Sequence, residues 1–297
     1  MEIIEKSPAR IEFISGGDHE HYINGMGWGS CLNATVNLYA FCKIVPHEGL
    51  FFNKNDFMMN YFLRFYKTRN VTVETYQEYP RASGLGGSAA HATAIIKALD
   101  SLHNRNRDQH DAALFAYDVE RKKLGVDGGY QDQFATNYRG FNYMIFRPES
   151  VEVNNIKPSE RFIKQLEAVS LLVHIPRKVT GDSIQKDMKS KSVNNLEIMK
   201  KKRDLCARGR DALINSDLDG FIKLVGQDYE LRKQESPLVD NEKTKEIEQI
   251  ALESADVCKF LGSGGGGCAL IFSRDKELTA ESLRGKAKIL NFRFEVI

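Results

Sequence analysis

The spacing of apolar and polar residues along the chain predicts a mixture of strands and helices. Alternating positions, or segments rich in β-branched and aromatic residues, are typical of strands. We expect strands at 10–14 (half-buried, because it alternates), 34–45, 71–76, 141–146, 168–175, 268–272 and 289–297. Apolar residues that recur every three or four positions predict helices at 89–102, 111–124, 196–215, 219–233 and 241–254. Strands and helices in both halves favour an α+β architecture.

The length of the chain favours more than one domain. At 297 residues it is long for a single hydrophobic core. The polar segment 149–160 contains Pro158 and follows Pro148, which is typical of a linker. We therefore predict an N-terminal domain at 1–160 and a C-terminal domain at 161–297.

The charge balance and the cysteine content indicate where the protein acts and what kind of partner it binds. The 42 basic and 40 acidic residues give a net charge of +2, so nothing favours binding to nucleic acid or a membrane surface. The acidic start lacks the apolar core of a secretory signal, and no apolar run reaches the roughly 18 residues of a membrane span. The 5 cysteines form no C-x-x-C pair, which disfavours a disulfide framework or a zinc site. We expect a cytoplasmic monomer or homodimer whose partners are small molecules.

A glycine-rich segment at 79–90 runs directly into the expected helix at 89–102. Glycine lets a backbone approach a ligand closely, and a helix N-terminus presents unpaired N–H groups and a positive dipole end. Together they make a phosphate site, whereas the simpler alternative is a turn leading into a buried helix capped by Ser88. This segment alone leaves both open. The residues of the phosphate site would be Pro80, Ser83, Gly84, Leu85, Gly86, Gly87, Ser88 and Ala89.

Other nucleotide-binding motifs do not explain the chain. The pattern Gly262-x-Gly264-x-x-Gly267 matches the dinucleotide fingerprint, but that motif must follow a strand and open a helix. Here we expect a helix before it and a strand after it. Neither a Walker A loop nor the protein-kinase motifs H-R-D and D-F-G occur. A phosphate at 84–88 would therefore be held by backbone N–H groups, the helix dipole and a metal, without a P-loop lysine.

Three clusters follow one another in a set order: residues 16–19 after the first strand, residues 80–90, and residues 262–267. This order resembles the GHMP kinase family, named for galactokinase, homoserine kinase, mevalonate kinase and phosphomevalonate kinase. The second cluster is similar to the family motif P-x-x-x-G-L-G-S-S-A-A, with Gly87 in place of the first serine. The resemblance spans nearly the whole chain. It implies an N-terminal domain like that of ribosomal protein S5, a ferredoxin-like C-terminal domain, and ATP in the cleft between them.

Within the family, residues 129–134, 139–143 and 261–267 resemble the D-glycero-D-manno-heptose 7-phosphate kinases. The loop at 17–22, which touches the sugar in the family, resembles instead the G-E-H-x-D-Y loop of galactokinases. The resemblance implies a kinase acting on the anomeric hydroxyl of that heptose phosphate, in the synthesis of nucleotide-activated heptose, or of an unphosphorylated monosaccharide. A third hypothesis is a non-catalytic sugar and ATP sensor. It is disfavoured because a full set of metal and catalytic residues is present.

The resemblance also implies roles for single residues. Asp132 would be the catalytic base that takes the proton of the acceptor hydroxyl, and Arg10 would pair with it or with the transferring phosphoryl group. Ser88 and Glu120 would bind Mg²⁺ through hard oxygen atoms. The ordinary alternatives are a turn aspartate, a surface arginine, an N-cap serine and a helix-surface glutamate. Contacts to the sugar are expected from Gly17, Asp18, His19, His21, Gly264 and Gly265.

Two further groups of residues have weaker interpretations. Asp18, His19 and His21 could hold a metal, but nothing else in the sequence supports such a site. A phosphorylated sugar tail could be held by Arg177, Lys178, Thr180 and Ser183. For these four we favour a basic surface turn.

Overall fold

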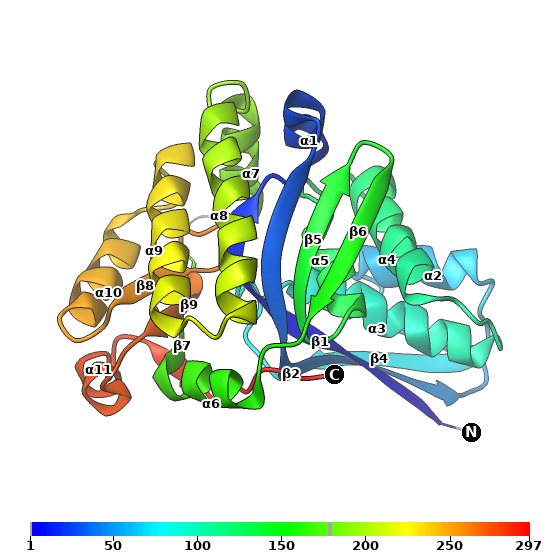
Figure 1. Ribbon diagram of the computed structural model, residues 1–297. Helices are drawn as coiled ribbons and strands as arrows, with labels where there is room; N and C mark the ends of the chain where they lie inside the picture. The colour runs from blue at the N-terminus through cyan, green and yellow to red at the C-terminus, as the bar shows by residue number, and fades with distance from the viewer. Residues whose placement is uncertain (1, 178–179) are drawn as a thin grey trace.

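The computed structural model describes residues 2–177 and 180–297, and within them it contains two β-sheets flanked by helices (Figure 1). The strands of the six-stranded sheet come from residues 3–156, and those of the four-stranded sheet from residues 170–290. This mixture of sheets and helices confirms the α+β architecture. The chain passes from one sheet to the other near residue 160, but the division into two domains stays a prediction. No helix in these ranges is long and apolar enough to cross a membrane.

The first sheet is organised around one long strand, β2. Its strands are β1 (Ile3–Gly16), β2 (Gly29–Pro46), β3 (Leu50–Phe51), β4 (Val71–Gln77), β5 (Phe141–Arg147) and β6 (Ser150–Ile156). β2 pairs with β1 along most of its length, and on its other side with β5 first and then with β4. The outer strands β3 and β6 pair with β4 and β5.

The strand expected at 10–14 is longer and more deeply buried than its alternating pattern indicated. In β1, residues 7–16 are all buried, because α3 (Gly87–Leu102), α8 (Leu196–Ile214) and α9 (Leu218–Glu235) pack against this strand. The polar positions Arg10 and Glu12 do not lie on the outer surface but line a cavity. The alternation therefore separates a core face from a cavity face, and the prediction of a half-buried strand was wrong.

The second sheet has the strand order β10-β7-β9-β8 and is antiparallel throughout its described residues. Its strands are β7 (Ser170–Ile175), β8 (Val257–Phe260), β9 (Gly267–Phe272) and β10 (Lys288–Leu290). β8 was not expected from the sequence. The strand expected at 289–297 is limited to β10, after which a bridge between Phe294 and Val36 joins the C-terminal segment to the first sheet.

The remaining helices show where local patterns were incomplete. They are α1 (Glu20–Met26), α2 (Phe57–Phe65), α4 (Gln109–Tyr117), α5 (Gln131–Asn137), α6 (Glu160–Val169), α7 (Gly181–Ser190), α10 (Glu242–Leu252) and α11 (Lys276–Ser282). The helix expected at 111–124 is divided into α4 and a π-helical segment, η1 (Asp118–Lys123). The segment 149–160, which was predicted to be a linker, contains β6. The segment 15–22, which was predicted to be a loop, contains the start of α1.

The two sheets share one hydrophobic core. Phe13 of β1 is fully buried, and its ring centroid lies 5.0 Å from that of Phe221 in α9, 5.7 Å from that of Phe294 and 6.1 Å from that of Phe141 in β5. The same apolar cluster extends to Leu270 of β9. Since aromatic side chains from both halves meet at Phe13, the two sheets stabilise each other.

We expect Phe13→Ala to lower the free energy of unfolding by about 3–5 kcal/mol, because it leaves a large cavity in this shared core. The control Phe57→Ala removes a ring that is 75% exposed and should change stability by no more than about 0.5 kcal/mol. Urea unfolding followed by circular dichroism measures both. A shared core also predicts one unfolding transition for the parent protein, so two separate transitions would contradict it.

Candidate active site

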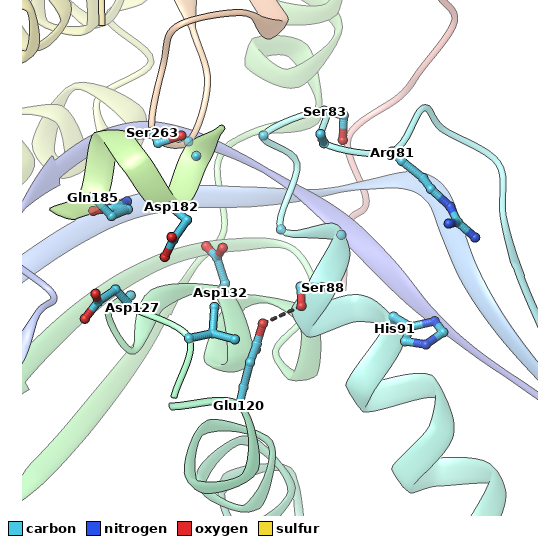
Figure 2. Close-up of a pocket in the computed structure, with 18 of the residues that line it drawn as sticks. Arg81, Ser83, Ser88, His91, Glu120, Asp127, Asp132, Asp182, Gln185 and Ser263 are labelled. Carbon is cyan, nitrogen blue, oxygen red and sulfur yellow. Dashed lines mark hydrogen bonds between the residues drawn. The ribbon is translucent and has the colours of Figure 1, made fainter. Parts of the chain in front are cut away.

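A single large cavity of about 1160 Å³ lies where the three sequence clusters meet. Pockets that hold one small ligand typically measure about 300–1,000 Å³, so this cavity has room for two ligands side by side. Its walls come from both halves of the chain: β1, the N-terminus of α3, η1 and α5 on one side, and α7, α9 and the β8–β9 loop on the other. Figure 2 shows Asp132, Glu120 and Ser88 facing the same space.

Arg10 and Asp132 form a partly buried ion pair on one wall of this cavity. Nε and Nη2 of Arg10 donate to Oδ1 of Asp132 at 2.9 and 2.6 Å, and Nη1 donates to the carbonyl oxygen of Gly84 at 2.5 Å. Burial alone would lower the pKa of Arg10, but the nearby carboxylates of Asp132 and Glu12 outweigh burial and raise it. The guanidinium therefore stays charged and fixes the direction of the Asp132 carboxylate.

Asp132 is not a turn residue, as the ordinary alternative had it, but lies in the first turn of α5. The Asp132 side chain is 29% exposed toward the cavity, whereas that of Arg10 is 3% exposed. Only Oδ1 of Asp132 is hydrogen-bonded to Arg10, which leaves Oδ2 available to a ligand in the cavity. The geometry suits a carboxylate that accepts a proton from a bound hydroxyl.

Ser88 and Glu120 form a second polar pair in the cavity. The hydroxyl of Ser88 donates to Oε1 of Glu120, and Nε2 of Gln133 donates to Oε2 at 2.5 Å. Glu120 is 1% exposed on the π-helical segment η1, so it is not a helix-surface residue. Ser88 is not the cap of α3 either, since Gly86 occupies that position. Its hydroxyl is therefore free to bond to Glu120.

The donor set of this pair fits a divalent cation that a ligand helps to bind. Within the described ranges, no group of three His, Cys, Asp or Glu side chains could hold a metal unaided. Mg²⁺ usually takes one or two protein oxygens and completes its octahedron with water and substrate phosphates. One carboxylate and one hydroxyl beside the loop that is expected to bind phosphate match that requirement. The same finding removes the alternative of a metal held by Asp18, His19 and His21.

The N-terminus of α3 opens into the cavity beside this pair. Gly86 caps the helix at φ +71°, and the first turn contains no acidic side chain to neutralise the positive end of the helix dipole. Of the eight residues expected to form the phosphate site, Leu85 and Ala89 are buried beneath the loop. The others line the cavity: Pro80, Ser83, Gly84, Gly86, Gly87 and Ser88.

The third cluster is a hairpin connection between β8 and β9, not a helix-to-strand turn as expected. It opens no helix, so the dinucleotide fingerprint is still absent. Gly262 and Ser263 line the cavity, whereas Gly264 and Gly265 do not. The space where side chains of the latter two would lie is filled by Val239 and Ile184. The expected sugar contacts from Gly264 and Gly265 are therefore not supported by their positions.

The second and third clusters touch through their backbones. A Cβ atom on Gly84 would lie 2.4 Å from the carbonyl oxygen of Leu261, so only glycine fits there. Arg177 joins the two loops, since its Nε donates to the carbonyl oxygen of Ala82 at 2.7 Å and its Nη1 to Oγ of Ser263 at 2.6 Å. Burial is the main reason that the pKa of Arg177 falls to about 10, which still leaves it charged.

The side chain of Arg177 thus holds the two loops together. The prediction that Arg177 belongs to a basic surface turn was therefore wrong. The sequence showed its charge but not its carbonyl partners. Of the other residues in that group, Thr180 caps α7 by accepting from the backbone N–H of Ser183 at 3.2 Å. Lys178 lies outside the described residues.

The first cluster lies against the segment that carries Asp132. Oδ2 of Asp18 accepts from the backbone N–H of Gln131 at 3.1 Å, and Asp18 occupies the space that a side chain on Gly129 would need. Gly17, Asp18 and His19 line the cavity. Burial lowers the pKa of His19 against the opposing effect of Asp18, so the imidazole is neutral near pH 7 and can both donate and accept.

His21, the fourth residue expected to touch the sugar from this loop, does not line the cavity. Burial, followed by the neighbouring His19, lowers the pKa of His21 to about 4. Its ring lies 5.2 Å from that of His19 and 4.2 Å from that of Tyr22. His21 therefore packs against neighbouring residues of its own loop and does not face the cavity.

Sequence reasoning missed the charged floor of the cavity. Glu12, Arg232 and Glu235 line it, and behind them lie Lys202, Asp228 and Lys259. A signal was present, because positions 228, 232 and 235 recur at helical spacing on one face of α9 together with buried apolar residues. Charged residues on the buried stripe of a helix indicate either an ion network or a ligand site.

A positioned carboxylate, an acid–hydroxyl pair and the open end of a helix around one large cavity define a phosphoryl-transfer site. Residues 53–140 match the family model of the GHMP kinase N-terminal domain. D-glycero-alpha-D-manno-heptose 7-phosphate kinase of Campylobacter jejuni subsp. jejuni is 27% identical over 90% of this chain and 88% of its own. The bifunctional fucokinase/GDP-fucose pyrophosphorylase of Arabidopsis thaliana is 28% identical over 78% of this chain and 22% of its own.

The fold gives the same assignment. A crystal structure from Campylobacter jejuni, designated a sugar kinase, superimposes with a TM-score of 0.78 at 25% identity, covering 99% of this chain and 96% of that one. Residues 53–140 therefore match the N-terminal domain of GHMP kinases, and the chain as a whole has the α+β fold of such kinases. It is an enzyme, a sugar kinase that transfers phosphate to an alcohol group. GHMP kinases use ATP as the phosphate donor.

We expect Gly86→Val to weaken nucleotide binding about 5- to 30-fold. A left-handed backbone at φ +71° costs a residue other than glycine about 1–2 kcal/mol, and the new Cβ would lie 3.1 Å from Cγ of Arg10. Gly27→Val is the matched control, because Gly27 also has a positive φ (+78°) but has open space around it and does not line the cavity. Titration calorimetry with Mg-ATP compares them. Equal affinities for the parent protein and Gly86→Val would remove this loop from the nucleotide site.

Proposed function

We propose that this enzyme transfers the γ-phosphate of ATP to the anomeric hydroxyl of a sugar. The single observation that carries the proposal is that Arg10 and Asp132 share a cavity with Ser88, Glu120 and the N-terminus of α3. In this scheme Oδ2 of Asp132 takes the proton of the acceptor hydroxyl. The hydroxyl oxygen then forms its bond to the γ-phosphorus while the bond to the β-phosphate bridging oxygen breaks, giving a sugar 1-phosphate and ADP.

The phosphate end of ATP is assigned to the loop at 80–88. Backbone N–H groups and the dipole of α3 favour anionic oxygens there. Ser88 and Glu120 would hold Mg²⁺, which neutralises charge on the phosphates when it is bound. Arg10 contributes a fixed positive charge next to the reacting groups. A cytoplasmic monomer or homodimer remains our expectation for the setting of this reaction.

Two acceptors remain as candidates. The first is D-glycero-D-manno-heptose 7-phosphate, in the synthesis of nucleotide-activated heptose, and it is supported by the relative that matches 90% of this chain. The second is an unphosphorylated monosaccharide, supported by the galactokinase-like loop at 17–22 and by the fucokinase relative. A non-catalytic sensor is disfavoured, because Asp132 is both held in place and open to the cavity.

One experiment separates these acceptors. The protein is incubated with Mg-ATP and a panel of free sugars and sugar 7-phosphates, and new phosphate signals are followed by phosphorus NMR. A sugar 1,7-bisphosphate supports the heptose phosphate, and a sugar 1-phosphate supports a free monosaccharide. ATP that stays intact with every sugar on the panel would count against catalysis.

Asp132→Asn should lower kcat by about 10²- to 10⁴-fold, because the amide cannot accept the proton in the way a carboxylate does. Nucleotide affinity should stay within about threefold of the parent value, since Asp132 lies outside the phosphate loop. The control Asp118→Asn removes an exposed carboxylate that pairs with Lys122, and it should keep full activity. A kcat for Asp132→Asn close to that of the parent enzyme would exclude Asp132 as the base.

Glu120→Ala should raise the Mg²⁺ concentration needed for half-maximal activity by at least about tenfold, the change expected when a charged ligand worth about 1.4 kcal/mol or more is lost. The control is Glu152→Ala, which removes a surface carboxylate near Arg147. Initial rates at fixed ATP across a Mg²⁺ series give both values. Superimposable Mg²⁺ curves for Glu120→Ala and the parent enzyme would take Glu120 out of the metal site.

A further inference from the structure

A buried carboxylate with an unused oxygen lies on the floor of the cavity. Glu235, at the C-terminal end of α9, lines the cavity although its side chain is completely shielded from bulk solvent. Its Oε1 accepts from Nζ of Lys202 at 2.5 Å. Its Oε2 has no hydrogen-bond partner among the described residues, and Nη1 of Arg232 lies 3.7 Å from it.

Charged side chains surround Glu235 and hold it in place. Lys202 also lies 3.5 Å from Asp228, and Asp228 accepts from Lys259 at 2.6 Å. Together with Glu12 and Arg232, the group contains three carboxylates and three cations, so it is neutral as a whole. Burial alone would lower the pKa of Lys202, but Asp228 and Glu235 outweigh burial and raise it.

An unpaired oxygen in this place is costly unless a ligand uses it. Leaving a buried acceptor unsatisfied carries the full desolvation penalty of that group, and the penalty is larger for a charged group. Oε2 therefore offers a strong acceptor site to any hydrogen-bond donor that enters the cavity. Native proteins rarely keep such groups without a reason, and sites that bind hydroxyl groups are one such reason.

The surroundings of Glu235 indicate what the donor is. Oε2 of Glu235 can only accept a hydrogen bond, and a fully ionised phosphate has no hydrogen to donate to it, whereas a hydroxyl group has one. The sulfur side chains of Met188 and Met199 also line the cavity and supply an apolar surface for the C–H face of a sugar ring. A neutral hydroxyl on a carbon skeleton fits both features.

We propose that Glu235 is a specificity-determining residue, whose Oε2 accepts a hydrogen bond from a non-anomeric hydroxyl of the acceptor sugar. The inference rests on the proposed sugar kinase function and deepens it, because it assigns a neutral hydroxyl, not a phosphate, to this part of the cavity. Arg232 holds Glu235 from one side and donates to the carbonyl oxygen of Gly262 on the other. It thereby connects the sugar subsite to the third cluster.

Glu235→Gln tests the proposal. The amide keeps the shape and can still accept from Lys202 through its oxygen, but its NH₂ group then replaces Oε2 and cannot accept. We expect the KM for the sugar to rise about 10- to 100-fold, the equivalent of one hydrogen bond to a charged group, and the KM for ATP to stay within about twofold. The control Glu230→Gln changes an exposed carboxylate on the same helix and should leave both KM values unchanged.

Deoxy sugars distinguish a direct contact between Glu235 and one sugar hydroxyl from a general structural effect of the Glu235→Gln substitution. The acceptor found in the phosphorus NMR panel is assayed beside analogues that each lack one non-anomeric hydroxyl. Parent enzyme should lose about 10- to 100-fold in kcat/KM with one analogue, and Glu235→Gln should lose almost nothing further with that same analogue. Equal losses in both enzymes for every analogue would overturn the role of Glu235.

Two other results also bear on the proposal, namely a variant that does not fold and a parent enzyme without sugar turnover. If Glu235→Gln fails to fold by circular dichroism, the double variant Lys202→Met/Glu235→Gln removes the ion pair together, and the same comparison with the deoxy sugars is made. If the parent enzyme phosphorylates no sugar at all, the proposed function fails and the inference fails with it. Sugar turnover that is insensitive to Glu235 contradicts only the inference.

Discussion

The arrangement of the site depends on the buried guanidinium of Arg10. It binds Asp132 with two of its nitrogens and the carbonyl oxygen of Gly84 with a third, while its own backbone N–H donates to the carbonyl oxygen of Leu85. One residue of β1 thus fixes both the carboxylate of Asp132 on α5 and the loop that leads into α3. Because a guanidinium is planar and always charged, it can hold these partners in one geometry.

The three sequence clusters meet because β1 runs through the middle of the fold. Arg10 and Glu12 project into the cavity from one face of the strand, and the same strand continues into the first cluster at Gly16. The other face contributes Phe13 to the core shared by the two sheets. Packing and chemistry are therefore coupled, since a change that separates the sheets also separates the walls of the cavity.

Much of the fold could be predicted from periodicity, and the failures have local causes. The helices at 196–215 and 219–233 were found because their apolar stripes are long. β8 was missed because it has only four residues and contains Lys259, whose ammonium is buried against Asp228. The lysine interrupts the apolar pattern that would indicate a strand. Its ion-pair partner lies 31 positions away in the sequence, so no local pattern shows that the lysine is buried.

The site could be predicted where glycine and acidic residues form local motifs, and not where tertiary contacts decide. Arg10, Ser88, Glu120 and Asp132 all line the cavity. Gly264 and Gly265 do not line it, and the space that their side chains would need is filled by Val239 and Ile184.

Whether a charged residue is buried depends on partners that are distant in the sequence. No local pattern around Glu235 could therefore show that one of its oxygens has no hydrogen-bond partner. This explains why family motifs identify the reaction better than the substrate. The residues proposed to bind phosphate are adjacent in the sequence, as at Gly86 and Ser88, whereas the floor proposed to meet the sugar is assembled from β1, α8 and α9. If this assignment holds, discrimination between acceptors depends on long-range packing, which local sequence motifs do not record.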